Sequence, residues 1–188
     1  EVLFKKYTTN FNHWRDQTIK QVPELAQTQQ HFSSEIITKS QVINGESVLH
    51  LRVKSSQNIG LISAMLIDYG EDDYIKPQTT EQNVMIDRGV NFAKVPLQEF
   101  ELQKASSKMI TIGHINLQNR TNAWQNDALV ANEYVAITLK LQPTLYQLRP
   151  GHQLGLIIYA TDFEMTIRGN QAITYTIDYE NSQLTLPQ

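Results

Sequence analysis

Two segments of the chain alternate strictly between hydrophobic and polar side chains. Leu49, Leu51 and Val53 alternate with His50, Arg52 and Lys54, and the run from Val135 to Gln142 repeats the pattern. Successive side chains of a β-strand point to opposite faces, so a period of two predicts a strand with one face buried and the other in water. Both segments are expected to lie in a sheet that covers a core.

Other segments extend this pattern into an all-β fold. Residues 61–67 are apolar on both faces, which predicts a central strand, and residues 154–160 are predicted to be a buried strand. Turn dipeptides such as Asn44-Gly45 and Pro150-Gly151 separate such runs. No alternation of strands and helices occurs, so a sandwich or barrel is expected rather than a parallel sheet. The predicted strands are 32–38, 49–54, 61–67, 108–115, 135–142, 154–160, 163–168, 173–179 and 183–186.

Three regions lack the strand pattern. Residues 1–31 are rich in glutamine and are interpreted as a lead-in or linker, with Pro23 able to open a short helix. Residues 68–73 are predicted to be an acidic loop, and residues 74–107, which contain two prolines, a long variable connection. The domain organisation expected is a short irregular or helical lead-in over 1–31, followed by one β domain over 32–188.

Composition narrows the functional classes. The chain has 188 residues, 40% of them hydrophobic and 19% charged, with a net charge of −3 and no cysteine. Such a surface gives no electrostatic reason to bind nucleic acid or an anionic membrane. Without cysteine, disulfides, thiolate metal sites and a cysteine nucleophile are excluded. No apolar run reaches the length of a membrane span, no signal peptide opens the chain, and Glu1 in first place indicates a processed or truncated piece.

No complete catalytic motif occurs in the sequence. A nucleophile elbow needs a serine between two glycines, and the surroundings of Ser47 and Ser63 do not supply them. No phosphate-binding loop or dinucleotide fingerprint is present. The histidines are too far apart in sequence for a helical metal pair, and His152, in a Pro-Gly-His turn, is expected to bond nearby backbone. The five are His13, His31, His50, His114 and His152.

Several weaker candidates have a functional and a structural interpretation. The run Glu71-Asp72-Asp73 could bind a hard cation but lacks calcium-loop spacing, so a solvated acidic turn is favoured. Asp162 and Glu164 are expected to share one face of a strand, where a carboxylate pair could do acid–base chemistry, but a role at the rim of a loop is favoured. Asn119-Arg120-Thr121 is a glycosylation sequon, a pattern that often arises by chance. Five aromatic residues are candidates for a sugar-stacking platform or for the core: Trp14, Trp124, Tyr134, Tyr146 and Tyr159.

Eight motifs stand out in combination over residues 32–187: Leu51–Ser56, Leu61–Asp68, Gly113–Arg120, Leu141–Tyr146, Pro150–Leu154, Tyr159–Phe163, Thr166–Asn170 and Leu184–Pro187. Together they resemble the C-terminal domain of Xaa-Pro dipeptidyl-peptidases, most closely those of lactic acid bacteria. Related domains occur in cocaine esterase and α-amino-acid ester hydrolases, many of which have a proline where Glu164 stands here. That departure favours the dipeptidyl-peptidase branch.

The resemblance implies a jelly-roll β-sandwich of the galactose-binding-like type. It implies a parent enzyme that removes X-Pro dipeptides from peptide N-termini, a cytoplasmic homodimer whose serine, aspartate and histidine lie in a preceding α/β-hydrolase domain. This domain would then pack against that hydrolase domain as its partner. None of the catalytic motifs is present here, so no catalytic, cofactor-binding or metal-binding residue is assigned, and no cofactor is expected.

Two other functions remain open on the sequence alone. The implied fold often binds sugars, so a carbohydrate-binding module is the main alternative, although fold by itself is only an analogy. An independent hydrolase that uses Asp162 and Glu164 is the other. The leading hypothesis is an accessory, non-catalytic domain of a serine exopeptidase.

Overall fold

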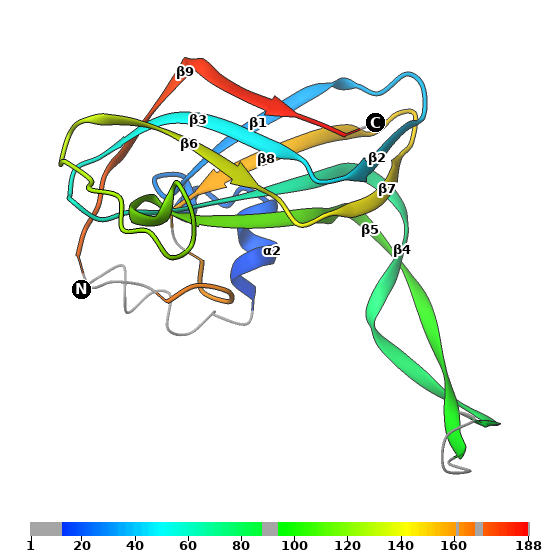
Figure 1. The fold of residues 1–188 in the computed structure, drawn as a ribbon. Helices are drawn as coiled ribbons and strands as arrows, with labels where there is room; N and C mark the ends of the chain where they lie inside the picture. Colours follow the sequence, from blue (N-terminus) through cyan, green and yellow to red (C-terminus); the bar gives the residue numbers. More distant parts are fainter. Residues whose placement is uncertain (1–12, 88–93, 161, 168–170, 188) are drawn as a thin grey trace.

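The computed structural model describes residues 13–87, 94–160, 162–167 and 171–187, and its architecture is that of an antiparallel β-sandwich (Figure 1). One sheet has four strands in the order β1-β8-β4-β5, and the other has three in the order β6-β3-β9. A two-stranded sheet, β2-β7, completes the set. The strands are β1 Gln29–Ile36, β2 Gln41–Gly45, β3 Val48–Ser55, β4 Leu61–Asp87, β5 Lys94–Asn116, β6 Tyr134–Lys140, β7 Thr144–Leu148, β8 Gln153–Tyr159 and β9 Tyr175–Thr185. The predicted all-β sandwich class is confirmed.

The centre of the four-stranded sheet is buried on both faces, which explains why residues 61–67 are apolar on both faces apart from Ser63. Ile62 and Leu66 face the main core, where they meet Leu51 and Val53 of β3 and other residues of the three-stranded sheet. Met65 and Ile67, the alternate residues of β4, face a second core on the other side of the sheet. The sequence predicted a central strand here because the segment lacks a polar face, and β4 does lie at the centre of its sheet.

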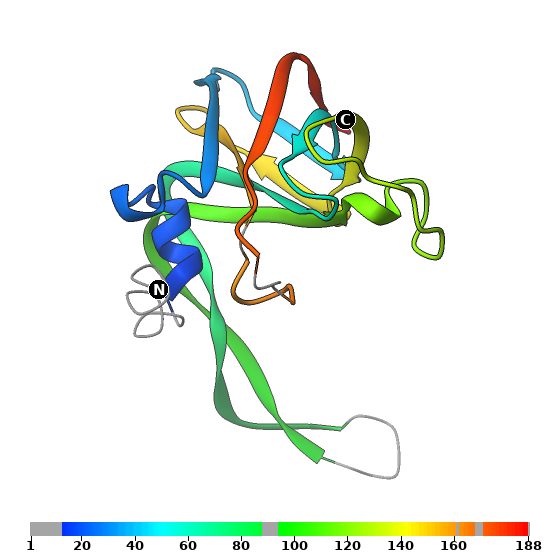
Figure 2. The same ribbon diagram turned by 90° about the vertical axis from the view of Figure 1, so that its left-hand side faces the viewer.

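The second core is closed by the N-terminal part of the chain. Helix α2 (Trp14–Ile19) and a 3₁₀ turn (Pro23–Leu25) lie against the four-stranded sheet (Figure 2). Proline at the start of the 3₁₀ turn has no N–H to leave unpaired, as expected from the sequence. Trp14 is 3% exposed and Leu25 is 1% exposed. The described part of the lead-in is thus packed onto the sheet, and β1 already begins at Gln29.

The prediction for residues 68–107 was wrong. In place of an acidic loop and a variable connection, β4 runs on to Asp87 and β5 returns from Lys94 as its antiparallel partner. Pairing of β4 with β8 ends at Tyr69↔Gln153, so the ribbon beyond has two strands only. It projects from the sandwich (Figures 1 and 2), and we call its described residues, 70–87 and 94–106, the arm.

The sequence of the arm does not show the regular alternation that predicts a strand, because it is rich in polar residues and its strands pair irregularly. The β4–β5 register shifts four times, once between Ile75 and Thr79 and once between Glu81 and Met85. Pro77 lies within the first of these two shifts, where a missing N–H is tolerated. Such irregularities break the period of two on which the sequence prediction depends.

Other strand predictions had mixed outcomes. The segments 49–54 and 135–142 form β3 and β6 with the predicted sides buried, whereas 173–179 and 183–186 join into the single strand β9. Strands β2 and β7 had not been predicted. Residues 163–168 were predicted to be a strand, but the described residues 163–165 form a turn. The Asp162 carboxylate accepts the backbone N–H groups of Glu164 and Met165, both at 2.8 Å, and this local bonding competes with a strand.

The turns predicted at Asn44-Gly45 and Pro150-Gly151 each contain a glycine in a turn conformation. Gly45 and Gly151 adopt positive φ angles of 126° and 87°, as turn glycines do. Gly169-Asn170, a further dipeptide that predicts a turn, lies outside the described residues. Within the described residues, no helix has both the length and the apolar character needed to cross a membrane.

Candidate functional site

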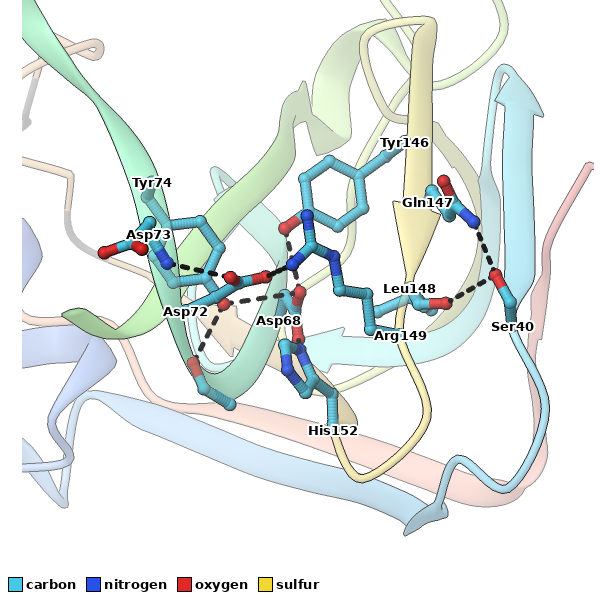
Figure 3. Close-up of polar contacts among 11 residues, drawn as sticks. Ser40, Asp68, Asp72, Asp73, Tyr74, Tyr146, Gln147, Leu148, Arg149 and His152 are labelled. Atoms are coloured by element: carbon cyan, nitrogen blue, oxygen red, sulfur yellow. Dashed lines mark hydrogen bonds and ion pairs between the residues drawn. The ribbon is translucent and has the colours of Figure 1, made fainter. Parts of the chain in front are cut away.

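A buried polar cluster lies where the arm leaves the sandwich, and we call it the root cluster (Figure 3). Its centre is Asp68 of β4, 1% exposed. Asp68 Oδ1 lies 2.8 Å from His152 Nδ1, and Asp68 Oδ2 accepts the Tyr146 hydroxyl at 2.8 Å and that of Tyr74 at 3.5 Å. Tyr74 also donates to the Gly70 carbonyl at 2.9 Å. Residues from β4, β7 and the turn before β8 therefore meet at one carboxylate.

Backbone contacts and one ion pair hold the turn that carries His152. The Ile37 N–H donates to the His152 carbonyl at 2.8 Å, and the Gly151 N–H donates to the Ile37 carbonyl at 2.8 Å. Arg149 pairs with Asp72 at 2.5 Å (Figure 3). Gly70 leaves room for the imidazole, because a methyl group there would overlap the His152 ring. The His152 side chain was expected to bond backbone, but it bonds the Asp68 carboxylate instead.

The electrostatics keep both tyrosines of the root cluster protonated. Burial, followed by the Asp68 and Asp72 charges, raises the pKa of Tyr74 to about 12. Burial and the hydrogen bond to Asp68 raise the pKa of Tyr146 as well. Protonated hydroxyls donate and a carboxylate only accepts, so the contacts of Asp68 are mutually compatible. No serine, threonine or lysine takes part in this set of bonds. The arrangement suits a structural clamp between the arm and the sandwich.

A second polar cluster contains a serine, a histidine and an aspartate. Ser63 Oγ lies 2.8 Å from His114 Nδ1, and Asp162 Oδ2 lies 4.0 Å from the same nitrogen. A catalytic triad uses one ring nitrogen for the serine and the other for the acid. Here both address Nδ1, while the buried Nε2 has no hydrogen-bond partner. Ser63 and Asp162 are both 0% exposed, whereas the His114 side chain is 23% exposed.

The Asp162–Glu164 pair expected from the sequence does not form. Asp162 Oδ2 accepts the Tyr159 hydroxyl at 3.0 Å, and its Oδ1 caps the following turn. Glu164 pairs with Arg15 at 2.5 Å. Burial lowers the pKa of His114, which favours its neutral form. The two carboxylates are thus engaged by separate partners because the segment is a turn, where alternation does not apply.

The remaining candidates are dispersed. Burial lowers the pKa of His31 in β1, while the exposed His50 in β3 has Nδ1 at 3.3 Å from Thr138 Oγ1. His13 is exposed at the start of α2. Over residues 13–87, 94–160, 162–167 and 171–187, no three histidine or carboxylate side chains are grouped to hold a metal ion. Asp72 of the acidic run is committed to Arg149.

The aromatic residues do not form a common sugar-binding platform. Trp14 is buried, with its ring 5.5 Å from that of Tyr159, and Tyr146 belongs to the root cluster. Tyr134 lies under the Arg52 guanidinium at 4.4 Å. Trp124 is 90% exposed. In the sequon, the Asn119 amide donates to the Gln125 carbonyl at 2.9 Å, a bond that holds the loop.

No local signal in the sequence could have revealed the root cluster. Asp68 and His152 are 84 residues apart, and Asp68 and Tyr146 are 78 apart. A carboxylate after an apolar strand is usually interpreted as solvated. The pairing of β4 with β8 places Asp68 opposite Leu154, two residues beyond His152, whereas Tyr146 comes from β7.

Comparison with known proteins shows the same architecture in larger hydrolases. An aminopeptidase from a marine-sediment Thaumarchaeota archaeon aligns with a TM-score of 0.60 at 13% identity, covering 85% of this chain and 25% of that one. A CocE/NonD family hydrolase from Staphylococcus aureus aligns with a TM-score of 0.53 at 14% identity, covering 85% and 30%. At these identities the likeness concerns the fold alone. The fold is therefore that of a β-sandwich domain which, in these solved structures, forms part of a longer chain.

Sequence relatives specify the family. Residues 3–187 match the X-Pro dipeptidyl-peptidase C-terminal non-catalytic domain, and the chain belongs to this family. Xaa-Pro dipeptidyl-peptidase of Streptococcus thermophilus strain CNRZ 1066 is 36% identical over 187 residues, and that of Ligilactobacillus salivarius strain UCC118 is 35% identical over 190. Both alignments cover 100% of this chain and 24% of the relative. The chain therefore spans about a quarter of the length of these relatives.

Proposed function

We propose that this chain is the accessory domain of a serine exopeptidase that releases X-Pro dipeptides from peptide N-termini, and that it packs against the α/β-hydrolase domain of the same polypeptide. The family match over residues 3–187 is the observation that carries the proposal. The two polar clusters are consistent with it. Asp68 accepts hydrogen bonds from three side chains, and Ser63, His114 and Asp162 are not arranged as a catalytic triad. Bond cleavage is thereby left to a part of the polypeptide outside these residues.

Turnover of an X-Pro p-nitroanilide tests this proposal. The 188-residue chain alone is expected to release no p-nitroaniline, whereas the complete polypeptide releases it. The Ser63→Ala variant of the complete polypeptide is the control for a hidden serine nucleophile, and its kcat is expected to be unchanged. Turnover by the chain alone, lost in Ser63→Ala, would contradict the accessory role.

Two further properties form part of the proposal. The complete polypeptide acts as a homodimer in the cytoplasm. Relatives of about four times this length leave ample surface for a subunit interface beyond these residues, and a chain without cysteine suits a reducing compartment. Sedimentation of the complete polypeptide at micromolar concentration and fractionation of the source cells test the two properties separately. A monomer, or recovery outside the cytoplasm, contradicts the corresponding property.

A further inference from the structure

Near its root, the arm has one face that is rich in apolar side chains. Cross-strand pairing places Ile75 opposite Leu102 and Thr79 opposite Phe100, and directly paired residues share a face. Ile75, Phe100 and Leu102 are 52%, 62% and 61% exposed. We call these three residues the apolar face of the arm, and the next pair on this face, Glu81 and Gln98, is polar.

The opposite face near the root is polar and internally paired. Residues of β5 that alternate with Phe100 and Leu102 are Glu99, Glu101 and Gln103. Glu101 forms an ion pair with Lys76 at 2.6 Å and accepts a hydrogen bond from Thr80. The polar side chains of this face pair with one another and are compatible with exposure to water. The apolar face, in contrast, exposes hydrophobic surface that a partner could cover.

An isolated two-stranded ribbon is at most marginally stable in water, and it needs a third strand or a packing surface. β8 provides that neighbour only as far as Tyr69. Beyond this point the described residues of the arm have no third strand. Contiguous exposed apolar side chains, bounded by polar ones, mark an interaction surface. The apolar face therefore requires a partner, and the root cluster fixes the direction in which the arm presents it.

We infer that the apolar face of the arm is a docking surface covered by the hydrolase part of the same polypeptide, an inference that rests on the proposed function. Relatives at 35–36% identity place about three quarters of their length outside the matched region. A covalently tethered partner is present at millimolar effective concentration, so the arm meets it before any second copy. Residues 70–87 in extended form span about 55 Å, enough to lie across a neighbouring domain.

Site-specific photocross-linking in the complete polypeptide tests the docking. Benzoylphenylalanine replaces Phe100 on the apolar face, and in a matched control it replaces Glu99 on the polar face. The expected result is a cross-link within one polypeptide from position 100 to a peptide outside this domain, with at least tenfold lower yield from position 99. Cross-linking to a second copy, cross-linking to this domain alone, equal yields from both positions or no cross-link at all would overturn the inference.

A serine pair gives an independent measurement. Phe100→Ser with Leu102→Ser is expected to lower the thermal midpoint of the complete polypeptide by about 3 °C or more, because docked apolar side chains are lost. Glu99→Ser with Gln103→Ser changes neighbouring positions on the other face and is expected to leave the midpoint unchanged. An equal midpoint in both double variants contradicts the inference.

The two proposals fail separately in these experiments. X-Pro p-nitroanilide turnover is measured on the same preparations. Turnover without the cross-link at position 100 contradicts the docking surface and leaves the peptidase assignment intact. The cross-link without turnover contradicts the peptidase assignment and leaves the intramolecular contact intact.

Discussion

The strand β4 passes through two environments, and the comparison between its halves shows what each part of the molecule depends on. From Leu61 to Tyr69 it lies between β8 and β5 with both faces in apolar cores. From Gly70 to Asp87 it has one neighbour, and Ile75 and Met85 are more than half exposed. The first half is held by packing, which is local to the domain. The second half is held by cross-strand bonds and by the root cluster at its base.

The largest expected effect is in the packed half. Leu66 is 0% exposed, so Leu66→Ala creates a cavity and is expected to lower the free energy of unfolding by about 3–5 kcal/mol. Phe100→Ala, in the arm of the same 188-residue chain, is expected to change it by less than about 0.5 kcal/mol. Urea denaturation followed by circular dichroism measures both. Similar losses in the two variants would erase the distinction between the halves.

The junction between the halves is tested at its central carboxylate. Asp68→Ala leaves His152, Tyr146 and Tyr74 without their acceptor in a buried site and is expected to cost about 3 kcal/mol. Asp73→Ala, at an exposed position in the same acidic run, is the control, with an expected change within about 0.5 kcal/mol. Equal midpoints in urea would show that the root cluster adds nothing to stability.

The close fit at the base of the arm has a smaller effect. Gly70→Ala places a methyl group against the His152 ring and is expected to cost about 2 kcal/mol. Combining it with His152→Ala removes the obstacle, so the second substitution should abolish most of the cost of the first. A double-mutant cycle measures this coupling. If the two stability changes simply add in the double variant, the cost of Gly70→Ala does not come from a clash with the His152 ring.

The smallest effect is a change in pH dependence. The pKa of Tyr74 is raised to about 12 in the folded chain, so the folded state binds this proton more tightly than the unfolded state. The protonated Tyr74 hydroxyl therefore contributes to stability in full below about pH 10, and this contribution is lost as pH rises through about 12. Tyr74→Phe is expected to flatten the fall in stability over this window relative to the unmodified chain. Identical slopes in the two chains contradict the assignment of the titration to Tyr74.

The sequence predicted the packed sandwich better than the exposed arm. Leu49, Leu51 and Val53 revealed β3 because a half-buried strand leaves a period of two. The arm is exposed over most of its surface, so no burial pattern marks it and its register shifts interrupt alternation. The root cluster depends on contacts across 78 and 84 residues. Local patterns do not encode contacts of this kind, whereas the family resemblance was confirmed by the match over residues 3–187.

The place of β1 in the sheet order has a consequence for synthesis. Its partner in the four-stranded sheet is β8, and the bonded residues Ser34 and Leu154 are 120 residues apart. At roughly 5–20 residues per second, a ribosome needs about 6–24 s to add that length. During this interval β1 is an open edge that carries Phe32 and Ile36, while the hairpin of β4 and β5 can already close. The nascent domain is therefore most prone to aggregate just before β8 emerges.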